Sequence, residues 1–338
     1  MDRRVEPRAF WASREHQRRR WLPLGAKGAV SALLLWILLQ RIDLGQMLST
    51  LAGVRLEFFT IALILYIGGQ LLSAFRWKIL TTPIGISASY GQLVALYFLG
   101  MFFNFFLPTV IGGDAVKAYY LARETRDSVR ALASVFMDRN TGLGALLLVA
   151  LVAAAVGRVE FADRPLVILL LGGLLLYVIL NLVLFADVSY RFLNRFFSAV
   201  RWMPLVVLVD RAHVALRAYR SAPLTLGKAV GVSLVFHLML IGLNYANARA
   251  LGLALDFLAF CVFIPIISLL SMLPITMYGL GVREYAFVLF FSSLGVTREA
   301  SLLLALLWFA VVVLASLPGA MVYIAYGRRS LAGSHSRS

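Results

Sequence analysis

Long apolar runs alternate with short polar segments along almost the whole chain. Runs of roughly 18 or more apolar residues are long enough to cross a bilayer as helices. We place candidate membrane segments at residues 22–40, 57–75, 90–107, 131–156, 165–185, 225–247, 254–273, 275–293 and 301–324. The pattern predicts an all-α integral membrane protein.

The segment 187–224 has a different pattern. Apolar and basic residues alternate there at helical spacing, so that Phe192 and Phe196 share the stretch with Arg191 and Arg195. Helices of this composition lie in the membrane interface. We expect cytoplasmic interfacial helices in this segment, with a partner-binding domain as the alternative.

The distribution of Lys and Arg predicts the topology, because cytoplasmic loops carry the excess of positive charge. The alternate segments 41–56, 157–164, 248–256 and 294–300 carry two, two, one and one Lys or Arg residues. The basic segments 76–89, 117–130, 187–228 and 325–338 carry two, four, seven and three. They all fall on one side only if 90–122 and 254–293 each enter and leave the membrane on the same face. We therefore expect about six full transmembrane helices plus two re-entrant broken-helix hairpins, with both termini cytoplasmic.

Composition and charge indicate the extent of the membrane domain and the membrane in which it lies. The chain is 61% hydrophobic and 14% charged, with a net charge of +16. We expect a basic N-terminal arm at 1–21, a membrane domain at 22–326 and a cytoplasmic tail at 327–338. The expected location is a bacterial inner membrane, and without a folded basic domain we expect no nucleic-acid partner.

The two predicted hairpins share sequence. "LPTVIGGDAVKAY" begins at Leu107 and "LPITMYGLGVREY" begins at Leu273, and the two align without gaps. The alignment matches Lys117 with Arg283. By the predicted topology the copies enter from opposite sides, and an inverted repeat of broken helices is a sequence indicator of a transporter binding site.

Proline and glycine residues mark where each hairpin breaks. Proline removes a backbone donor, and glycine permits a tight turn. Each helix would restart, near Asp114 and near Val282, with its positive dipole end pointing inward, where it favours an anion such as a lipid phosphate. The alternative is a proline kink with a glycine packing contact. The predicted break and hinge residues are Pro108, Gly112, Gly113, Pro274, Gly279 and Gly281.

Charged residues at membrane depth are the candidate substrate-binding set, because they are costly there unless paired or hydrated. We expect Asp138 to pair with Lys117 or Arg283, and Arg139 to pair with Asp114 or Glu284. A structural ion-pair network is the alternative, and helix capping is an alternative for Asp114. The set is Asp114, Lys117, Asp138, Arg139, Arg283 and Glu284.

Two further groups have simpler interpretations. Arg76, Trp77 and Lys78 end an apolar run, which is typical of anchoring at a membrane boundary. His237 and Asn244 are two helical turns apart and so share a face, which favours hydrogen bonding between helices or the lining of a cavity.

Several kinds of chemistry lack a motif in this sequence. The chain has no P-loop, G-x-S-x-G, H-E-x-x-H or dinucleotide fingerprint. Its single cysteine, Cys261, excludes an internal disulfide framework and a cysteine-based metal site. We expect no catalytic residues, no metal and no cofactor.

Four stretches together resemble one known family, the lysylphosphatidylglycerol synthase transmembrane region or flippase-like family. They are "LSAFRWKIL", "FFNFFLPTVIGGDAVKAYYLAR", "ASVFMDRNTGLGAL" and "LPITMYGLGVREYAF", in the family's order, and the similarity spans about residues 22–326. The resemblance implies a re-entrant architecture and a lipid substrate. The best-known relatives also carry a cytosolic aminoacyl-transfer domain; since this chain ends at Ser338, we do not expect synthase activity.

We expect a lipid translocase that is not an enzyme. Its substrate would be an anionic or aminoacylated phospholipid or a polyprenyl-linked lipid, and its partners a lipid-synthesis enzyme or a second copy of the chain. One alternative is a membrane enzyme acting on a polyprenyl phosphate, with Asp138 or Glu284 as base and a divalent metal. The other is a non-catalytic subunit of a lipid-synthesis complex.

Overall fold

The computed structural model describes residues 29–40, 42–107, 112–156, 164–200, 203–273, 276 and 279–335. All regular elements in these ranges are helices, which confirms the all-α prediction. The predicted arm at 1–21 lies outside the described residues, and so do the predicted break residues Pro108 and Pro274.

An unlabelled first helix, Ala29–Leu39, precedes twelve others in the described chain. These are α2 (Leu44–Ala52), α3 (Leu56–Thr81), α4 (Tyr90–Asn104), α5 (Gly112–Thr125), α6 (Ser128–Val156), α7 (Arg164–Phe185), α8 (Asp187–Ala199), α9 (Met203–Arg220), α10 (Pro223–Ala250), α11 (Phe257–Met272), α12 (Val282–Ser292) and α13 (Arg298–His335).

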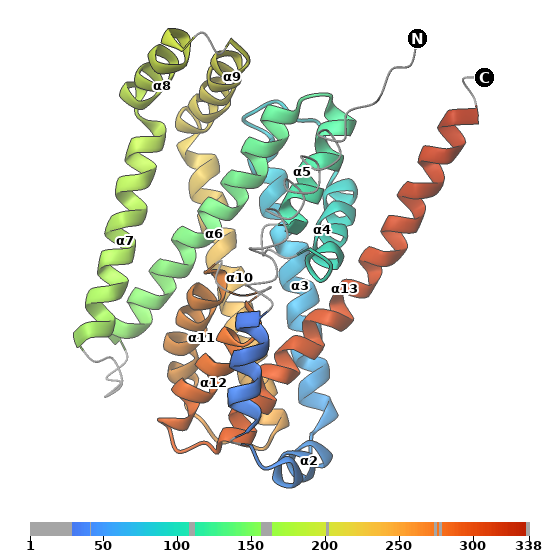
Figure 1. Cartoon of the computed structure of the whole chain (residues 1–338), viewed down its shortest axis with the longest axis vertical. Coiled ribbons are helices and arrows are strands. Elements are labelled where there is room, and N and C mark those ends of the chain that lie inside the picture. The colour runs from blue at the N-terminus through green and yellow to red at the C-terminus, as the bar shows by residue number, and fades with distance from the viewer. Residues whose placement is uncertain are drawn as a thin grey trace, which may run out of the picture.

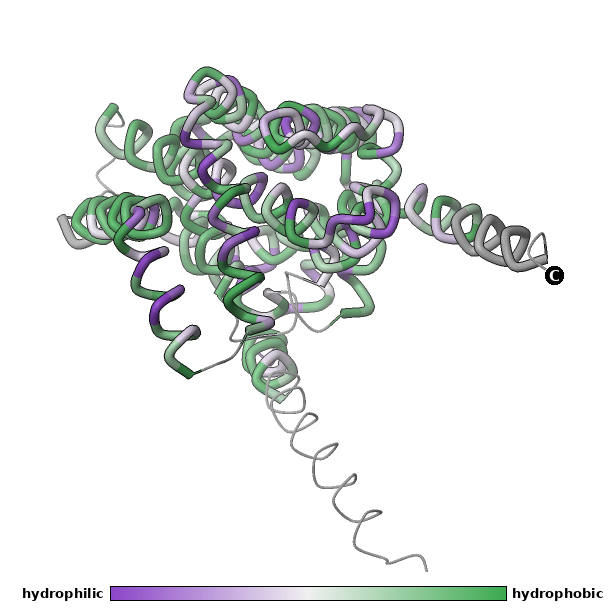
Figure 2. Tube along the Cα trace, turned by 90° about the horizontal axis from the view of Figure 1, so that it is seen from above, coloured by the Kyte–Doolittle hydropathy of each residue, from purple (hydrophilic) through white to green (hydrophobic). Residues whose placement is uncertain are grey.

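Five of the helices are long and apolar enough to cross a membrane: α3, α6, α7, α10 and α13. The first helix and α2 meet at an angle of 87° and count as a sixth span if they are taken together. The number agrees with the expectation of about six. The chain is therefore a multi-pass membrane protein, and Figure 2 shows hydrophobic residues over most of its helices.

Helices α4, α5, α11 and α12 form two neighbouring pairs, and each of the four is too short to cross alone. At 1.5 Å per residue α4, α5, α11 and α12 measure about 22, 21, 24 and 16 Å, less than the roughly 30 Å of a bilayer core. Helix α4 contacts α5, and α11 contacts α12. Figure 1 places α4 and α5 towards the end that holds α8 and α9, and α11 and α12 towards the end that holds α2. This arrangement is compatible with two hairpins entering from opposite faces, which stays a prediction.

The two helix pairs are held by the same two long helices. Helix α6 contacts both α5 and α11, and α13 contacts both α4 and α12. Each pair also belongs to its own apolar cluster: Trp77 and Leu96 are buried in the cluster around α4, and Phe263 and Phe287 in the cluster around α11 and α12. Movement of one pair relative to the other would therefore have to be accommodated along α6 and α13.

Glycine is required at the start of both α5 and α12. A Cβ atom on Gly113 would lie 2.0 Å from the carbonyl oxygen of Gly100 on α4, so a side chain there would separate the two helices. Gly281 has a φ of +87° and Gly279 a φ of +73°, values that side chains disfavour. The predicted hinge glycines thus meet real backbone constraints.

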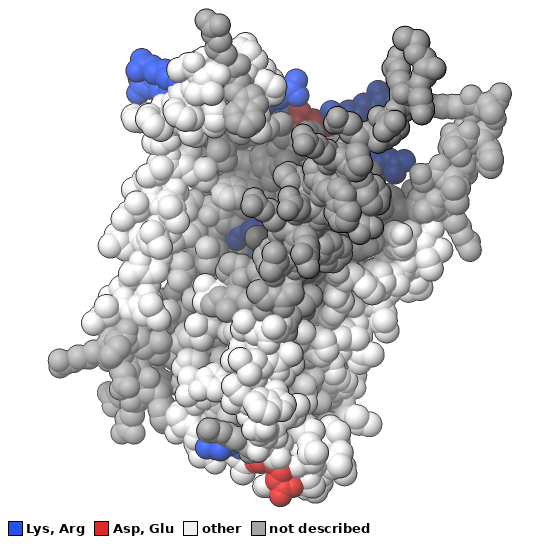
Figure 3. Space-filling model, viewed as in Figure 1, with Lys and Arg blue, Asp and Glu red and all other residues white. Residues whose placement is uncertain are grey.

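Helices α8 and α9 fill the segment predicted to be interfacial. They contact each other at one end of the molecule, beyond α7 (Figure 1). Phe192 and Phe196 on α8 are exposed. The Tyr190 hydroxyl donates to Asp210 at 2.9 Å across the helix pair. Figure 3 shows charged side chains gathered at the two ends of this face, with an uncharged band between them that one recessed basic side chain interrupts.

Candidate functional site

A polar cavity of about 210 Å³ lies between α3, α4, α5, α6 and α10, with one residue each from α11 and α13 at its boundary. A charged group at membrane depth is expected to face such a cavity or another helix rather than lipid. The charged residues that line it are Arg76, Asp114, Lys117, Asp138 and Arg139. Four of the six predicted substrate-binding residues are therefore brought together.

Asp114 and Arg139 form a bidentate ion pair between α5 and α6. Arg139 Nε donates to Asp114 Oδ2 at 2.5 Å, and Arg139 Nη2 donates to Asp114 Oδ1 at 3.0 Å. This pairing was one of the two predicted for Arg139. Helix α5 begins at Gly112, so Asp114 lies within the first turn and its carboxylate binds cations. The alternative role of Asp114 as the capping residue is therefore wrong.

Lys117 links the two carboxylates of the cavity. Its Nζ atom lies 2.9 Å from Asp114 Oδ1 and 3.8 Å from Asp138 Oδ2. The ammonium group also lies 4.1 Å from the centre of the Tyr97 ring, at cation–π distance. Because Asp114 has both Lys117 and Arg139 as partners, its charge would still be balanced if one of them moved away.

The main partner of Asp138 is Arg76, which the sequence did not predict. Arg76 Nε donates to Asp138 Oδ1 at 2.8 Å, and the Tyr97 hydroxyl donates to Asp138 Oδ2 at 3.3 Å. Arg76 is 4% exposed and Trp77 is fully buried, so their assignment as boundary anchors is wrong. The predicted Asp138–Lys117 contact is present at longer range, and Asp138 does not pair with Arg283 among the contacts of the described chain.

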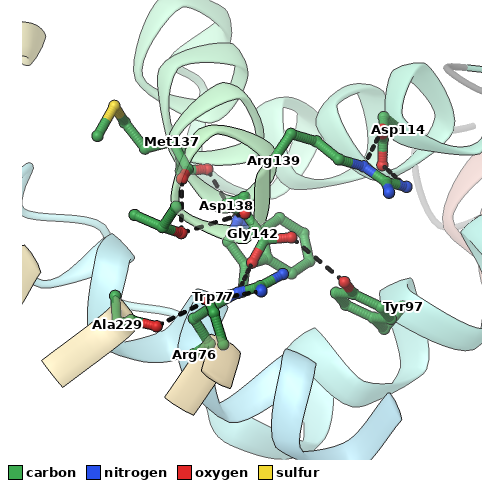
Figure 4. A network of polar contacts seen from close by, with 12 residues as sticks. Arg76, Trp77, Tyr97, Asp114, Met137, Asp138, Arg139, Gly142 and Ala229 are labelled. Carbon is green, nitrogen blue, oxygen red and sulfur yellow. Dashed lines mark hydrogen bonds and ion pairs between the residues drawn. The ribbon is translucent and has the colours of Figure 1, made fainter. Parts of the chain in front are cut away.

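These contacts form one chain of alternating charge, Arg139–Asp114–Lys117–Asp138–Arg76, which we call the ion chain. Figure 4 labels its four members other than Lys117, with Arg139 beside Asp114 and Arg76 near Asp138. It holds three cations and two carboxylates and so has one positive charge in excess. Four of its side chains are nearly fully buried, whereas the side chain of Arg139 is 43% exposed. The ion chain thus presents its only substantially exposed cation at one end.

Of the other two predicted residues, Arg283 lines a second cavity of about 160 Å³, and Glu284 is its neighbour in the chain. Arg283 Nη2 donates to Glu284 Oε1 at 2.6 Å, and Glu284 Oε2 accepts from the Gly281 N–H at 2.6 Å. Glu284 therefore caps α12 and neutralises Arg283. The predicted alternative in which Glu284 pairs with Arg139 is wrong. The Arg283 guanidinium lies 4.3 Å from the centre of the Trp308 ring.

The two cavities share Met272 and Trp308 on their linings. Their matched cations have similar surroundings: Lys117 and Arg283 are each buried, paired with a carboxylate and placed over an aromatic ring. The carboxylates differ in position, since one precedes its cation by three residues and the other follows it directly. The two aligned segments therefore each place a buried cation near the start of a short helix, α5 or α12.

Polar residues of α10 take both of the roles considered for them. His237 lines the first cavity, and its Nε2 donates to the Gly142 carbonyl on α6 at 2.9 Å. Asn244 lines the second cavity, and its buried Oδ1 has no hydrogen-bond partner among the residues that the structure describes. A buried acceptor without a partner is costly.

The residues that would hold a metal are not grouped in the described ranges. No cluster of three or more His, Cys, Asp or Glu side chains occurs among them. The carboxylates of the first cavity instead bind Arg and Lys. This arrangement is suited to holding a polar or charged group by hydrogen bonds and ion pairs.

The architecture and the paired charges can be compared with known proteins. A profile of the family described as lysylphosphatidylglycerol synthase TM region matches residues 25–319. The chain belongs to this family. The match covers the ion chain, both short helix pairs and α8 and α9, so the whole candidate site lies within the family's region. The resemblance identified from the four sequence motifs is confirmed.

Two relatives are described as UPF0104 membrane proteins. The one from Methanothermobacter thermautotrophicus is 25% identical in an alignment of 272 residues that covers 74% of this chain and 77% of that protein. The one from Methanocaldococcus jannaschii is 30% identical over 95 residues, which are 28% of each chain. No solved structure matches this chain. The relatives' descriptions support a membrane protein of this family.

Proposed function

We propose that this family member is a lipid translocase of the bacterial inner membrane. A lipid headgroup would occupy the first cavity while its acyl chains stay in the bilayer. Arg139, Lys117 and Arg283 would contact the phosphate, and Asp114, Asp138 and Glu284 would balance their charge. The chain would make and break no covalent bond, and it would use no cofactor or metal.

The ion chain is the observation that carries this proposal. A lone charge at the centre of a membrane helix costs about 2.5–3.5 kcal/mol on insertion scales. Five charged residues line one cavity here. Buried ion pairs are also weak sources of stability compared with apolar packing. A binding role for the cavity gives these costs a functional reason.

Movement of the headgroup would use both cavities. The shared residues Met272 and Trp308 lie between the ion chain and Arg283. Rocking of one helix pair against the other would open each cavity to one side of the membrane in turn. The phosphate would then pass from the cations of the first cavity to Arg283, which is held over the Trp308 ring.

The test is headgroup accessibility of labelled lipids in proteoliposomes that contain only this protein. The rate of loss of asymmetry would be measured for phosphatidylglycerol, an aminoacylated phosphatidylglycerol and a polyprenyl phosphate. Each lipid would be tested with the wild-type protein and with Arg283→Gln. We expect fast loss of asymmetry for one lipid and at least a tenfold slower rate in the variant, because a charge-assisted hydrogen bond is worth about 1.5–3 kcal/mol. Equal slow rates for all three lipids would contradict the proposal.

A further inference from the structure

A third cavity, apolar and about 360 Å³ in volume, adjoins the ion chain from the outside of the helix bundle. It is a groove between α5 and α6, lined by Ala115, Leu132, Val135 and Phe136, with Met272 of α11 at its boundary. Leu132 is 55% exposed and Phe136 47% exposed, so the groove is open at the surface of the described structure. Its inner end is formed by Asp114 and Arg139.

The groove places apolar side chains next to a cation, which matches the acyl chains and the neighbouring phosphate of a phospholipid. Leu132, Val135, Phe136 and Arg139 recur at i, i+3, i+4 and i+7 and so lie on one face of α6. The first three are apolar, and the last carries the partly exposed guanidinium of the ion chain. Arginine binds phosphate oxygens through its planar fork, whereas apolar side chains gain from burying hydrocarbon.

The Asp114–Arg139 pair separates this groove from the first cavity, because both residues line both spaces. The phosphate of an arriving lipid can bind the Arg139 guanidinium in place of the Asp114 carboxylate. Asp114 would then keep Lys117 at 2.9 Å, so its buried charge would not be left alone. One phosphodiester would also balance the single positive charge in excess on the ion chain.

From this arrangement we infer that the groove between α5 and α6 is a lateral entry site for a diacyl phospholipid with a net negative charge, whose phosphodiester is its only charged group. One acyl chain lies along Leu132, Val135 and Phe136. The phosphate displaces Asp114 from Arg139 and thereby opens the way into the first cavity. This inference rests on the proposed function and adds the route and the charge class of the substrate.

Photocrosslinking tests the site separately from transport. The probe is phosphatidylglycerol with a diazirine in one acyl chain, placed in phosphatidylcholine vesicles with the full-length protein. Mass spectrometry locates the label, and the same vesicles report the rate of lipid translocation. Leu132→Trp fills the groove, and Val152→Trp is the matched control because Val152 is 60% exposed on the same helix and does not line the groove.

The expected result is labelling of α5 and α6 beside Leu132 and Phe136. Leu132→Trp should lose labelling and translocation at least tenfold, while Val152→Trp should match wild type. Arg139→Gln should lower labelling by about ten- to a hundredfold, since it removes a charged hydrogen-bond partner of the phosphate. A diazirine phosphatidylcholine probe, which has no net charge, should label the groove more weakly than phosphatidylglycerol.

Each other outcome identifies which idea fails. Translocation with an unlabelled groove, and equal rates in the two tryptophan variants, would overturn lateral entry and leave the translocase proposal standing. A labelled groove without translocation would support the binding site and overturn the proposed function. Absence of both labelling and translocation would overturn both, and equal labelling by the two lipids would overturn the anionic specificity.

Discussion

The Arg76–Asp138 pair should show strong coupling when it is removed. Arg76 Nε lies 2.8 Å from Asp138 Oδ1, and the two side chains are 4% and 0% exposed. Removing one partner of such a pair costs about 3–5 kcal/mol, because the remaining charge is buried without compensation. Replacing both partners by apolar residues of similar volume is often neutral or stabilising.

The structure also predicts that the two single substitutions differ. In Arg76→Met, Asp138 would keep Lys117 at 3.8 Å and the Tyr97 hydroxyl at 3.3 Å. In Asp138→Leu, Arg76 would keep the Ser233 hydroxyl at 2.9 Å and lose its carboxylate partner. We expect losses of about 3 kcal/mol for Arg76→Met and about 5 kcal/mol for Asp138→Leu, and less than about 2 kcal/mol for the double variant.

The assay is reversible unfolding of the purified protein in mixed micelles with increasing dodecyl sulfate, analysed as a double-mutant cycle. The exposed Arg130–Asp127 pair, at 3.3 Å, is the matched control and should couple by less than about 1 kcal/mol. With these values the buried pair should couple by about 6 kcal/mol or more in magnitude, because the double variant regains most of the stability that the two single substitutions lose. A coupling no larger than that of the control pair would refute the reasoning.

Two further predictions concern the packing of α5 against α4 and the helix pair α8–α9. Gly113→Ala should prevent assembly of a monodisperse protein, because its Cβ would lie 2.0 Å from the Gly100 oxygen. Gly231→Ala is the control, because a Cβ atom there meets open space. Equal yields of the two variants on size exclusion and equal melting temperatures would contradict this prediction. The hydrogen bond to Asp210 raises the pKa of Tyr190 above its usual value near 10. The contribution of the protonated Tyr190 hydroxyl to folding stability is present below pH about 10 and is lost as pH rises through the pKa of Tyr190 in the folded state. Selective NMR labelling should show the raised midpoint, and Asp210→Asn should restore the ordinary value; an unchanged midpoint would argue against the hydrogen bond.

Hydropathy was sufficient to predict the long helices, because membrane spans need continuous apolar sequence. The predicted segments 57–75, 131–156, 165–185, 225–247 and 301–324 each lie within or overlap a helix that can cross a membrane. The predicted breaks also agree with the ends of α4 and α11 and the starts of α5 and α12. Proline and glycine give a local signal for such ends, so no tertiary information was needed.

Charge pairing could be predicted only in part. Arg139 and Asp114 were matched because both stand at membrane depth in neighbouring segments and each needs a partner. Arg76 was missed because it lies near the polar end of an apolar run, where arginine is common. Its burial depends on how α3 rotates against α6 and α10, and the packing that sets this rotation joins residues 62 positions apart.

Glu284 shows a second limit of sequence reasoning. Its distance from Arg139 in space could not be inferred from spacing, whereas its capping contact with Gly281, three residues earlier, follows a known local pattern. The signal was therefore present, and a capping interpretation would have found it. For Asp114 the capping interpretation was considered and is wrong, because α5 begins at Gly112, two residues before Asp114.

The central claim is that the ion chain carries a lipid headgroup across the membrane. The most direct measurement is the rate at which labelled phosphatidylglycerol loses asymmetry in proteoliposomes, with wild type, Asp114→Asn and Val152→Trp compared at equal protein content. Asp114→Asn keeps the shape of the side chain and removes the charge that Lys117 and Arg139 share. Our account predicts fast exchange in wild type and Val152→Trp and at least tenfold slower exchange in Asp114→Asn, while all three stay monodisperse. Equal rates in wild type and Asp114→Asn would contradict it.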